Sequence, residues 1–363
     1  MTDTEATPSA VASIEHGVRP LTIAIVGATG NVGSTLLEVL AERGIPIAQL
    51  RAFASSRSAG KTVMCGAQSA LVEDLSDPDL DLSGIDVALF SAGAARSVRH
   101  AEQFTSAGAI VVDNSSAFRL HPQVPLVVPE VNADALADIP RGIVANPNCS
   151  TIQLMVALKP LHDAYGLDRV SVTTMQSTSG TGRAAMQELE HQSRVVMGVA
   201  AEPPEIYPHE IAFNVLPQCD DFADGDFTKE ELKLVNESRK ILGEPDLRLV
   251  ATCTRVPVFI GHSEVVHLEL QRGATASDVR ELLAASPGLE LVDDPAAGRY
   301  PMARAAAGKD EVFVGRVRQD PTMPDNRGIA LFIVADNLRK GAATNAVQIV
   351  EALIVRGQWN SAT

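Results

Sequence analysis

The stretch LTIAIVGATGNVG, residues 21–33, decides the fold. Its first six residues form a continuous apolar run, which is typical of a parallel strand buried on both faces. A glycine-rich turn follows, and apolar residues then recur with helical spacing over 32–41. Glycines between a strand and a helix let the backbone approach a pyrophosphate at the helix N-terminus. The spacing is GxxGxxG and not GxGxxG, but its place at the first strand–helix junction favours a dinucleotide site.

The alternation of strands and helices continues to about residue 150. Strands are expected at 47–53, 86–91, 109–112 and 142–145, and helices at 94–107 and 151–165. This order predicts a parallel, doubly wound, Rossmann-like sheet. The second half instead shows period-2 alternation, typical of a sheet with one face toward solvent or an interface. Its strands are expected at 169–175, 247–258, 263–271, 311–318 and 329–335, and its helices at 228–242, 276–284 and 341–356.

Length and composition exclude several classes of protein. The 363 residues suggest about two domains. The net charge of −15 argues against a nucleic-acid or anionic-membrane partner. Four cysteines without a CxxC pair form neither a disulfide scaffold nor a zinc ribbon, and we expect no metal. Residues 1–20 lack the apolar run of a secretion signal. We therefore expect a flexible leader and a cytoplasmic protein.

The second expected strand indicates which dinucleotide binds. NAD-binding sites usually place an acidic residue there, to bond the ribose 2′-hydroxyl. This chain has hydroxyls and cations instead, which suit a 2′-phosphate, so NADP is favoured over NAD. A solvated polar loop is the alternative explanation for any one of them. The residues are Ser55, Ser56, Arg57, Ser58 and Lys61.

Cys149 lies in Asn-Pro-Asn-Cys-Ser-Thr, just before an expected helix. The partial positive charge of a helix N-terminus favours a thiolate, which is the nucleophilic form. We expect Ser150 and Thr151 to bond the first N–H groups of this helix. The other three cysteines, Cys65, Cys219 and Cys253, are expected to be buried and inert.

A thiolate beside a nicotinamide suggests attack on a carbonyl or acyl phosphate, followed or preceded by hydride transfer. Such a site needs a proton shuttle. His262 lies at a glycine-hinged turn, and His267, five residues on, would face the other side of a strand, so the two do not form a metal pair. Spacing alone leaves open whether His262 is catalytic or structural.

Together these motifs resemble the aspartate-semialdehyde dehydrogenase family. The resemblance covers residues 21 to about 357 in family order. It is carried by GATGNVG (27–33), SSRSAGK (55–61), VVDNSSAFR (111–119), PLVVPEVN (125–132), NPNCSTIQ (146–153), QSTSGTG (176–182), TKEELKLVNESRKIL (228–242), TRVPVFIGHSE (254–264) and DNLRKGAATNAVQI (336–349). It implies NADPH-dependent reduction of L-aspartyl-4-phosphate to L-aspartate 4-semialdehyde and phosphate. This step feeds lysine, threonine, methionine and diaminopimelate synthesis. It further implies a homodimer or tetramer, and a second, α+β domain with a mixed sheet for catalysis and dimerisation.

The resemblance also implies residue roles. Cys149 corresponds to the nucleophile that forms a thioacyl intermediate, His262 to the general acid/base and Gln176 to the residue that orients the intermediate. For the substrate, Arg255 corresponds to the α-carboxylate ligand, Glu230 to the partner of the amino group, and Arg119 with Lys233 to the phosphate ligands. The implied cofactor contacts are Gly27, Thr29, Gly30, Asn31, Val32, the five polar residues named above, Ser179, Gly180 and Asn345.

These assignments also make sense chemically. Glu230 and Lys233, three apart on a helix, share one face, although a plain surface ion pair is the alternative. Arg255 and His262 are seven apart across a turn and could face one pocket. N–H groups at the start of the helix after Cys149 would stabilise a developing oxyanion, with Asn148 as a less secure donor.

We expect a leader at 1–20, an NADP-binding domain at 21–149 completed by the helix 341–357, and a catalytic and dimerisation domain at 150–340. The conformation of 200–226, Pro-rich and acidic, is not predicted. Three alternatives stay open: an N-acetyl-γ-glutamyl-phosphate reductase, which would not need Glu230; a phosphorylating glyceraldehyde-3-phosphate dehydrogenase; and a non-catalytic NADP-binding paralogue.

Overall fold

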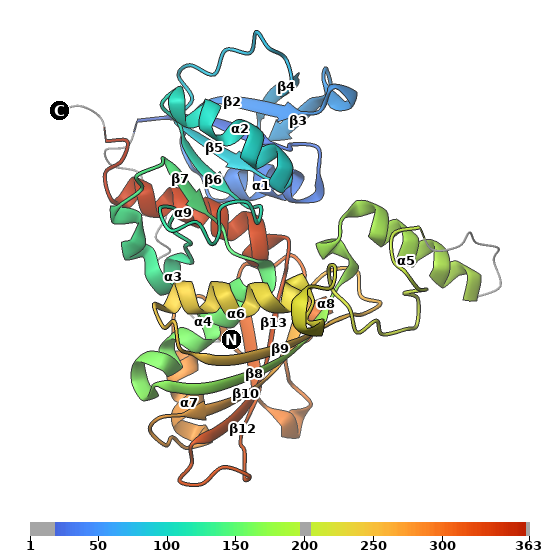
Figure 1. The fold of residues 1–363 in the computed structure, drawn as a ribbon, viewed down its shortest axis with the longest axis vertical. Coiled ribbons are helices and arrows are strands. Elements are labelled where there is room, and N and C mark those ends of the chain that lie inside the picture. The colour runs from blue at the N-terminus through green and yellow to red at the C-terminus, as the bar shows by residue number, and fades with distance from the viewer. Residues whose placement is uncertain (1–18, 197–204, 361–363) are drawn as a thin grey trace, which may run out of the picture. The chain divides into compact units, whose positions relative to one another are not determined.

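The structure, a computed structural model, describes residues 19–196 and 205–360. Most of the expected leader and part of 200–226 lie outside these ranges. Contacts divide the chain into two compact units (Figure 1). The first unit contains the chain up to 125, then 133–146 and the part from 346 onward; the second contains 126–132 and 147–345. The domain boundaries at 149 and 340 stay predictions, because compactness alone does not show that a segment folds by itself.

The first unit is built on a seven-stranded sheet in the order β3-β4-β2-β1-β5-β6-β7. All neighbouring pairs are parallel except β3 with β4, which form a hairpin. The chain order reverses between β2–β1 and β5, as expected for a doubly wound sheet. The strands are β1 Leu21–Val26, β2 Ile47–Ala54, β3 Thr62–Cys65, β4 Gln68–Asp74, β5 Val87–Phe90, β6 Ile110–Asp113 and β7 Ile143–Ala145.

Apolar side chains between this sheet and its helices form the core of the first unit. Phe104 packs edge-to-face on Phe53 and on Phe90, with ring centroids 5.6 and 5.1 Å apart. Arg43 and Glu351 form a two-pronged ion pair that attaches the end of the chain to this unit. The helices are α1 Asn31–Glu42, α2 Ala94–Ser106 and α9 Thr344–Val355, with 3-10 turns at Ser56–Ser58 and Ala133–Ala137. Helix α9 belongs to this unit from residue 346 onward.

The second unit contains a six-stranded mixed sheet in the order β11-β12-β13-β10-β8-β9. β8 and β9 are parallel, as are β11 and β12, and the remaining pairs are antiparallel. The expected mixed sheet is therefore confirmed. Its strands are β8 Leu167–Gln176, β9 Arg248–Arg255, β10 His262–Leu270, β11 Leu289–Leu291, β12 Val312–Gln319 and β13 Gly328–Ala335.

Helices α4, α6 and α7 cover one face of this sheet (Figure 1). The other face exposes Thr173, Val250 and His267. His262 is fully buried, so the two histidines of β10 do face opposite sides. The helices are α3 Pro129–Asn132, α4 Cys149–Tyr165, α5 Arg183–Val196, α6 Lys229–Leu242, α7 Ala276–Ala284 and α8 Ala303–Ala306, with 3-10 turns at Thr178–Gly180, Asp224–Asp226 and Pro295–Ala297 and a π-helix at Arg339–Ala343.

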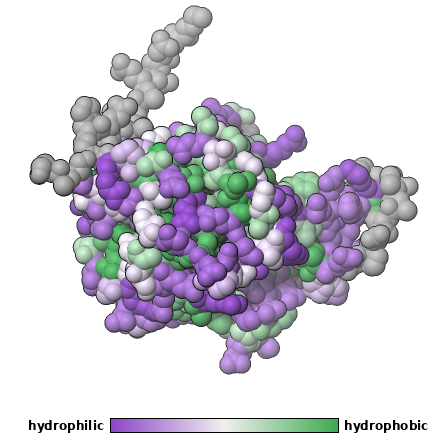
Figure 2. Space-filling view, turned by 90° about the horizontal axis from the view of Figure 1, so that it is seen from above, coloured by the Kyte–Doolittle hydropathy of each residue, from purple (hydrophilic) through white to green (hydrophobic). Residues whose placement is uncertain are grey.

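None of the helices within 19–196 and 205–360 is long and apolar enough to cross a membrane. On the face seen in Figure 2, hydrophilic side chains predominate and apolar ones are scattered among them.

Candidate active site

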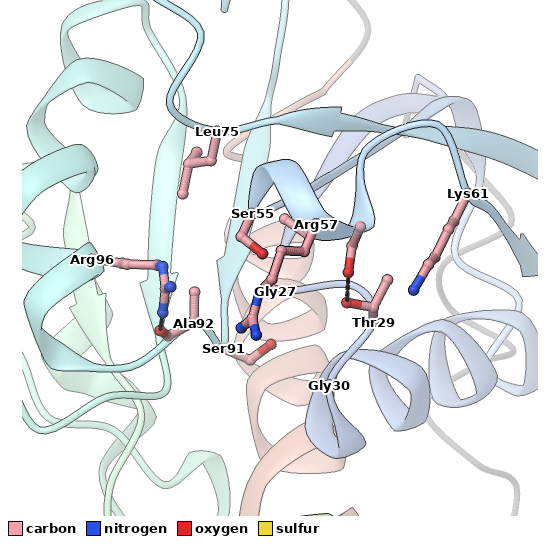
Figure 3. Close-up of a pocket in the computed structure, with 12 residues that line it drawn as sticks. Gly27, Thr29, Gly30, Ser55, Arg57, Lys61, Leu75, Ser91, Ala92 and Arg96 are labelled. Atoms are coloured by element: carbon pink, nitrogen blue, oxygen red, sulfur yellow. Dashed lines mark hydrogen bonds between the residues drawn. The ribbon is translucent and has the colours of Figure 1, made fainter.

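A cavity of about 450 Å³ opens in the first unit at the carboxyl ends of β1, β2 and β5 (Figure 3). Its floor is the glycine turn. Gly27 has φ +93°, and a Cβ on Gly33 would lie 2.2 Å from the Gly27 carbonyl oxygen, so this turn requires glycine at both places. Helix α1 begins after Gly30, which has no side chain to occupy the helix N-terminus. The turn is therefore shaped for close backbone approach by an anionic ligand.

Cations and hydroxyls line the rim of this cavity. Arg57 and Lys61 extend from the segment after β2, and Arg96 extends from α2 (Figure 3). Thr29 Oγ1 donates to Ser58 Oγ over 3.3 Å, which links the glycine turn to that segment. No acidic residue of the described chain lines the cavity. The residues present fit a phosphorylated dinucleotide.

Seven of the predicted cofactor residues line this cavity: Gly27, Thr29, Gly30, Ser55, Arg57, Ser58 and Lys61. Asn31, Val32 and Ser56 belong to the same turns but do not line it, and their contacts stay predictions. Sequence reasoning missed Ala54, Leu75, Ser91, Ala92 and Arg96. A signal existed for three of these, since Ser91, Ala92 and Arg96 follow β5, which ends at the same edge of the sheet.

Cys149 is the first residue of α4, in the second unit. The N-cap is Asn148, whose side-chain oxygen accepts from the backbone N–H of Ser150 at 3.0 Å and of Thr151 at 3.3 Å. The expectation that Ser150 and Thr151 cap the helix is therefore wrong. Their hydroxyls are buried and have no hydrogen-bond partner in the described part of the chain. The asparagine reaches these N–H groups because it lies just before the first turn.

The other three cysteines are buried, as expected. Burial raises the pKa of the Cys65 thiol, and it raises that of Cys219 to about 12. Burial also raises the pKa of Cys253. These thiols are therefore poor nucleophiles at neutral pH. Cys149 is the partly accessible cysteine among the four, and none of them forms a disulfide.

Glu230, on α6, is a centre of the polar contacts around α4. Its Oε1 accepts from Asn148 Nδ2 and from Gln176 Nε2, each at 2.9 Å. Its Oε2 pairs with Lys233 Nζ at 3.0 Å. Burial alone would raise the pKa of Glu230, but the charge of Lys233 and the hydrogen bonds from Gln176 and Asn148 lower it to about 2. The carboxylate is thus ionised and buried, unlike a plain surface pair.

Lys233 completes this group. Burial would lower its pKa, but Glu230 and Asp220 raise it to about 12, so it stays charged. Its Nζ lies 2.6 Å from Asp220 Oδ2. The helix that carries both residues is fixed by a capping box between Thr228 and Glu231.

Arg255, at the end of β9, and His262, at the start of β10, face one small space beside Gly180. A Cβ on Gly180 would lie 3.2 Å from Arg255 Nη1 and 3.2 Å from His262 Nε2. Arg255 Nη1 donates to the Ser177 carbonyl at 2.7 Å. Arg255 Nε and His262 Nε2 are buried without a partner in the described chain. His262 Nε2 therefore lies without a partner in the described chain beside a space that glycine keeps open, and the guanidinium of Arg255 borders the same space.

His262 has one ring nitrogen already engaged. The backbone N–H of Ser177 donates to Nδ1 at 3.1 Å. In a neutral ring this places the proton on Nε2, which faces Gly180. Burial and, second, the charge of Arg255 lower the pKa of His262 to about 3. His262 is therefore a neutral Nε2–H donor.

Sequence reasoning missed Asn337, which organises this loop. Its Oδ1 accepts from Ser177 Oγ, Ser179 Oγ and the Gly261 N–H over 2.9–3.0 Å. The predicted cofactor residues Ser179 and Gly180 are thus held in the second unit, and their cofactor contacts stay predictions.

Two further predicted residues have contacts of their own. Asn345 is buried, donates to the Val127 carbonyl at 3.0 Å and lies 3.2 Å from Lys340 Nζ. Arg119, in the first unit, donates from Nε to the Asn146 carbonyl and from Nη2 to the Asn114 carbonyl, both at 2.9 Å. Both side chains are therefore held in place, and their ligand contacts stay predictions.

Glu264 is a buried acid that the sequence did not single out. It lies two residues beyond His262, and both carboxyl oxygens lack a hydrogen-bond partner in the described chain. Burial raises the pKa of this carboxyl well above its usual value. Gln153 opposes this shift only in part, so burial favours the protonated form of the Glu264 carboxyl.

Comparison with known proteins agrees with this geometry. Residues 22–139 match the family described as semialdehyde dehydrogenase, NAD binding domain, and residues 158–340 match its dimerisation domain. The aspartate-semialdehyde dehydrogenase of Legionella pneumophila is 51% identical over 92% of this chain and 96% of its own length. That of Aquifex aeolicus is 47% identical over 92% and 98%.

A solved structure shows the same likeness. The aspartate semialdehyde dehydrogenase II of Vibrio cholerae, complexed with ASA, has a TM-score of 0.89 and 46% identity, and the match covers 93% of this chain and 99% of that one. The chain therefore belongs to the aspartate-semialdehyde dehydrogenase family.

Proposed function

We propose that the protein reduces L-aspartyl-4-phosphate with NADPH to L-aspartate 4-semialdehyde and phosphate, a step of amino-acid biosynthesis in the cytoplasm. One observation supports this proposal most: Arg255 Nη1 and His262 Nε2 border the space beside Gly180, and Arg255 Nε and His262 Nε2 are buried without a partner in the described chain, in the unit that carries Cys149. An anionic amino-acid substrate would supply the missing acceptors. Glu230, ionised and buried, would take the ammonium group of the same substrate.

In this proposal Cys149 is the nucleophile. Its thiolate attacks C4 of the acyl phosphate, the C–O bond to phosphate breaks, and a thioester remains on the sulfur. Bound NADPH supplies the hydride that reduces this thioester. The resulting thiohemiacetal oxygen re-forms a carbonyl, the C–S bond breaks, and the aldehyde leaves. His262 Nε2–H donates a hydrogen bond to the oxygen that becomes negative in each addition.

The other residues would hold substrate groups in position. The planar guanidinium of Arg255 matches the α-carboxylate. Gln176, held by Glu230, would orient the intermediate. Arg119 and Lys233 would bind the phosphate, as the resemblance implies, and both carry the charge that this needs.

The test of this function is the reverse reaction. Purified protein, NADP, inorganic phosphate and L-aspartate 4-semialdehyde should give NADPH, followed by absorbance. The rate should depend on phosphate and should be far lower with N-acetylglutamate semialdehyde. Absence of phosphate-dependent NADPH formation would refute the proposal, and a preference for the acetylated substrate would favour the reductase alternative.

Glu230 gives a prediction about substrate choice. We expect Glu230→Gln to raise the KM for aspartate semialdehyde by about 10-fold or more, because a hydrogen bond between two charged groups contributes about 1.5–3 kcal/mol. Succinic semialdehyde lacks the amino group, so its kcat/KM should change much less. Equal losses for both substrates would show that Glu230 supports the site without contacting the amine.

The cofactor pocket gives a prediction about NADP. We expect Arg57→Gln to raise the KM for NADP by about 10-fold and to leave that for NAD nearly unchanged, since only NADP has the 2′-phosphate. Arg96→Gln is the matched control, because Arg96 lines the same cavity from α2. Its NADP/NAD preference should stay as in the wild type. An unchanged preference in Arg57→Gln would contradict the assignment.

The second unit also supports a homodimer. Residues 158–340 match a dimerisation domain, and one face of the sheet in this unit exposes side chains such as Thr173 and Val250. An apolar cavity of about 350 Å³ on this unit is lined by Val265, Tyr300, Pro301, Arg316, Arg318, Leu331 and Phe332. We propose that a second copy of the chain covers these residues. Association into a tetramer would need a further surface.

A further inference from the structure

Asn148, just before the proposed nucleophile, is held at each of its polar groups. Its side-chain oxygen caps α4, and its Nδ2 donates to Glu230. Its backbone N–H donates to Glu237 Oε2 at 2.7 Å, across 89 residues of sequence. The backbone N–H of Asn148 and one hydrogen of its Nδ2 therefore already donate hydrogen bonds within the protein. This makes Asn148 a poor candidate even for the assisting oxyanion donor that the sequence suggested.

Glu237 is 1% exposed and lies seven residues after Glu230, so both carboxylates face α4 from the same side of α6. Burying a carboxylate is costly unless its oxygens are bonded. An apolar residue would suit the packing of α6 better. The hydrogen bond to Asn148 therefore indicates a reason for the acid beyond helix packing.

We propose that Glu237 is a positioning residue for Cys149: by holding the Asn148 N–H, it fixes the point at which the chain enters α4. This rests on the proposed role of Cys149 as nucleophile. Cys149 packs closely against the backbone of Gly341, since a Cβ on that glycine would lie 2.9 Å from the Cys149 Cβ. A shift of about 1 Å in a reacting atom can lower a rate about 100-fold.

The experiment compares three substitutions. Glu237→Ala removes the acceptor and should lower kcat by about 10- to 100-fold, with the KM for aspartate semialdehyde within about 3-fold of wild type. Glu237→Gln keeps an oxygen acceptor and should retain most of kcat. Glu237→Asp keeps the charge but withdraws it by one methylene, so its kcat should fall between these values. It also keeps the test possible if the alanine variant does not fold.

Asp293→Ala is the matched control. The Asp293 side chain is likewise fully buried; it accepts from the backbone N–H of Arg316 and of Val317 at 2.7 and 3.1 Å and pairs with Arg280 Nε at 2.7 Å, so its partners belong to elements other than α4 and α6. This variant should lose stability and keep its kcat. Equal kcat losses in Asp293→Ala and Glu237→Ala would overturn the proposal, as would unchanged kcat in Glu237→Ala or no rescue by Glu237→Gln.

A readout without turnover separates this proposal from the proposed function. Amide hydrogen exchange in a peptide covering residues 146–153 should be at least about 10-fold faster in Glu237→Ala than in wild type, and unchanged in Asp293→Ala. If wild-type protein fails to oxidise aspartate semialdehyde, the proposed function is refuted. Amide hydrogen exchange still tests whether Glu237 fixes the backbone at Asn148. An unchanged exchange rate of this peptide in Glu237→Ala would show that Glu237 does not fix this segment.

Discussion

Cys149→Ser is expected to lower the phosphate-dependent rate of NADPH formation from aspartate semialdehyde by at least about 10⁴-fold. A serine hydroxyl is far less acidic than a thiol, and the neutral His262, which carries its proton on Nε2, cannot accept the serine proton at that nitrogen. Nearly isosteric replacement at the first residue of α4 should leave the fold and its N-cap unchanged. The rate is measured by absorbance, together with NADP binding by fluorescence.

Cys65→Ser is the control for this substitution. Cys65 is buried in the first unit, and burial raises the pKa of its thiol, so it is a poor nucleophile at neutral pH. The variant should keep its activity, and iodoacetamide should inactivate this variant and the wild type alike. Alkylation should be found at Cys149 by mass spectrometry. More than about 1% of wild-type activity in Cys149→Ser would refute its role as nucleophile.

His262→Ala is expected to lower kcat by about 10²- to 10⁴-fold, the usual range for loss of a proton-handling or oxyanion-binding group. His262→Gln should recover part of this loss, because an amide N–H can lie near the former Nε2. The pKa of about 3 means that His262 stays neutral above that pH. Titration of His262 should therefore leave no inflection near pH 6.5 in the kcat of the wild type. Any inflection seen there should also be present in His262→Gln.

The same pKa also makes a prediction about stability. The ring has a pKa of about 3 when folded and near its ordinary value of 6.5 when unfolded. Its contribution to the free energy of unfolding is therefore present above pH 6.5 and is lost as the pH falls toward 3. Urea titrations should show a steeper loss of stability over this interval in wild type than in His262→Gln. Parallel curves would indicate that His262 is not buried as a neutral ring.

The central strands of the first sheet were predictable because their apolar runs are unbroken. Strands β1 and β5 are buried on both faces, so every residue must be apolar or small. The hairpin of β3 and β4 was missed because much of it faces solvent: Met64 is 56% exposed and Leu71 66%. Helix α5 was missed too, since its sequence is mainly polar.

The proposed catalytic side chains were found from local motifs, but their contacts were not. The motif around Cys149 showed that a helix would begin there, and the wrong capping assignment came from reading forward to Ser150 instead of back to Asn148. No local pattern indicates that Glu237 would bond a backbone N–H 89 residues earlier. Contacts of this kind depend on how α4 and α6 pack, which residue spacing does not encode.

The interleaving of the two units has a consequence for how the protein forms in the cell. Residues 346–360 complete the first unit, and Ala346, Val347, Val350 and Leu353 are buried. A ribosome releases them only after the whole second unit, 147–345, has been translated. The strands from β1 to β7 must therefore wait, with part of their apolar surface open, for a helix made about 10–40 s later at ordinary elongation rates of about 5–20 residues per second. During this interval the nascent sheet is exposed to aggregation, so binding by a chaperone or by the nucleotide itself would matter most then. Preparing the nucleotide-binding unit alone would require short linkers in place of both parts of the second unit, 126–132 and 147–345.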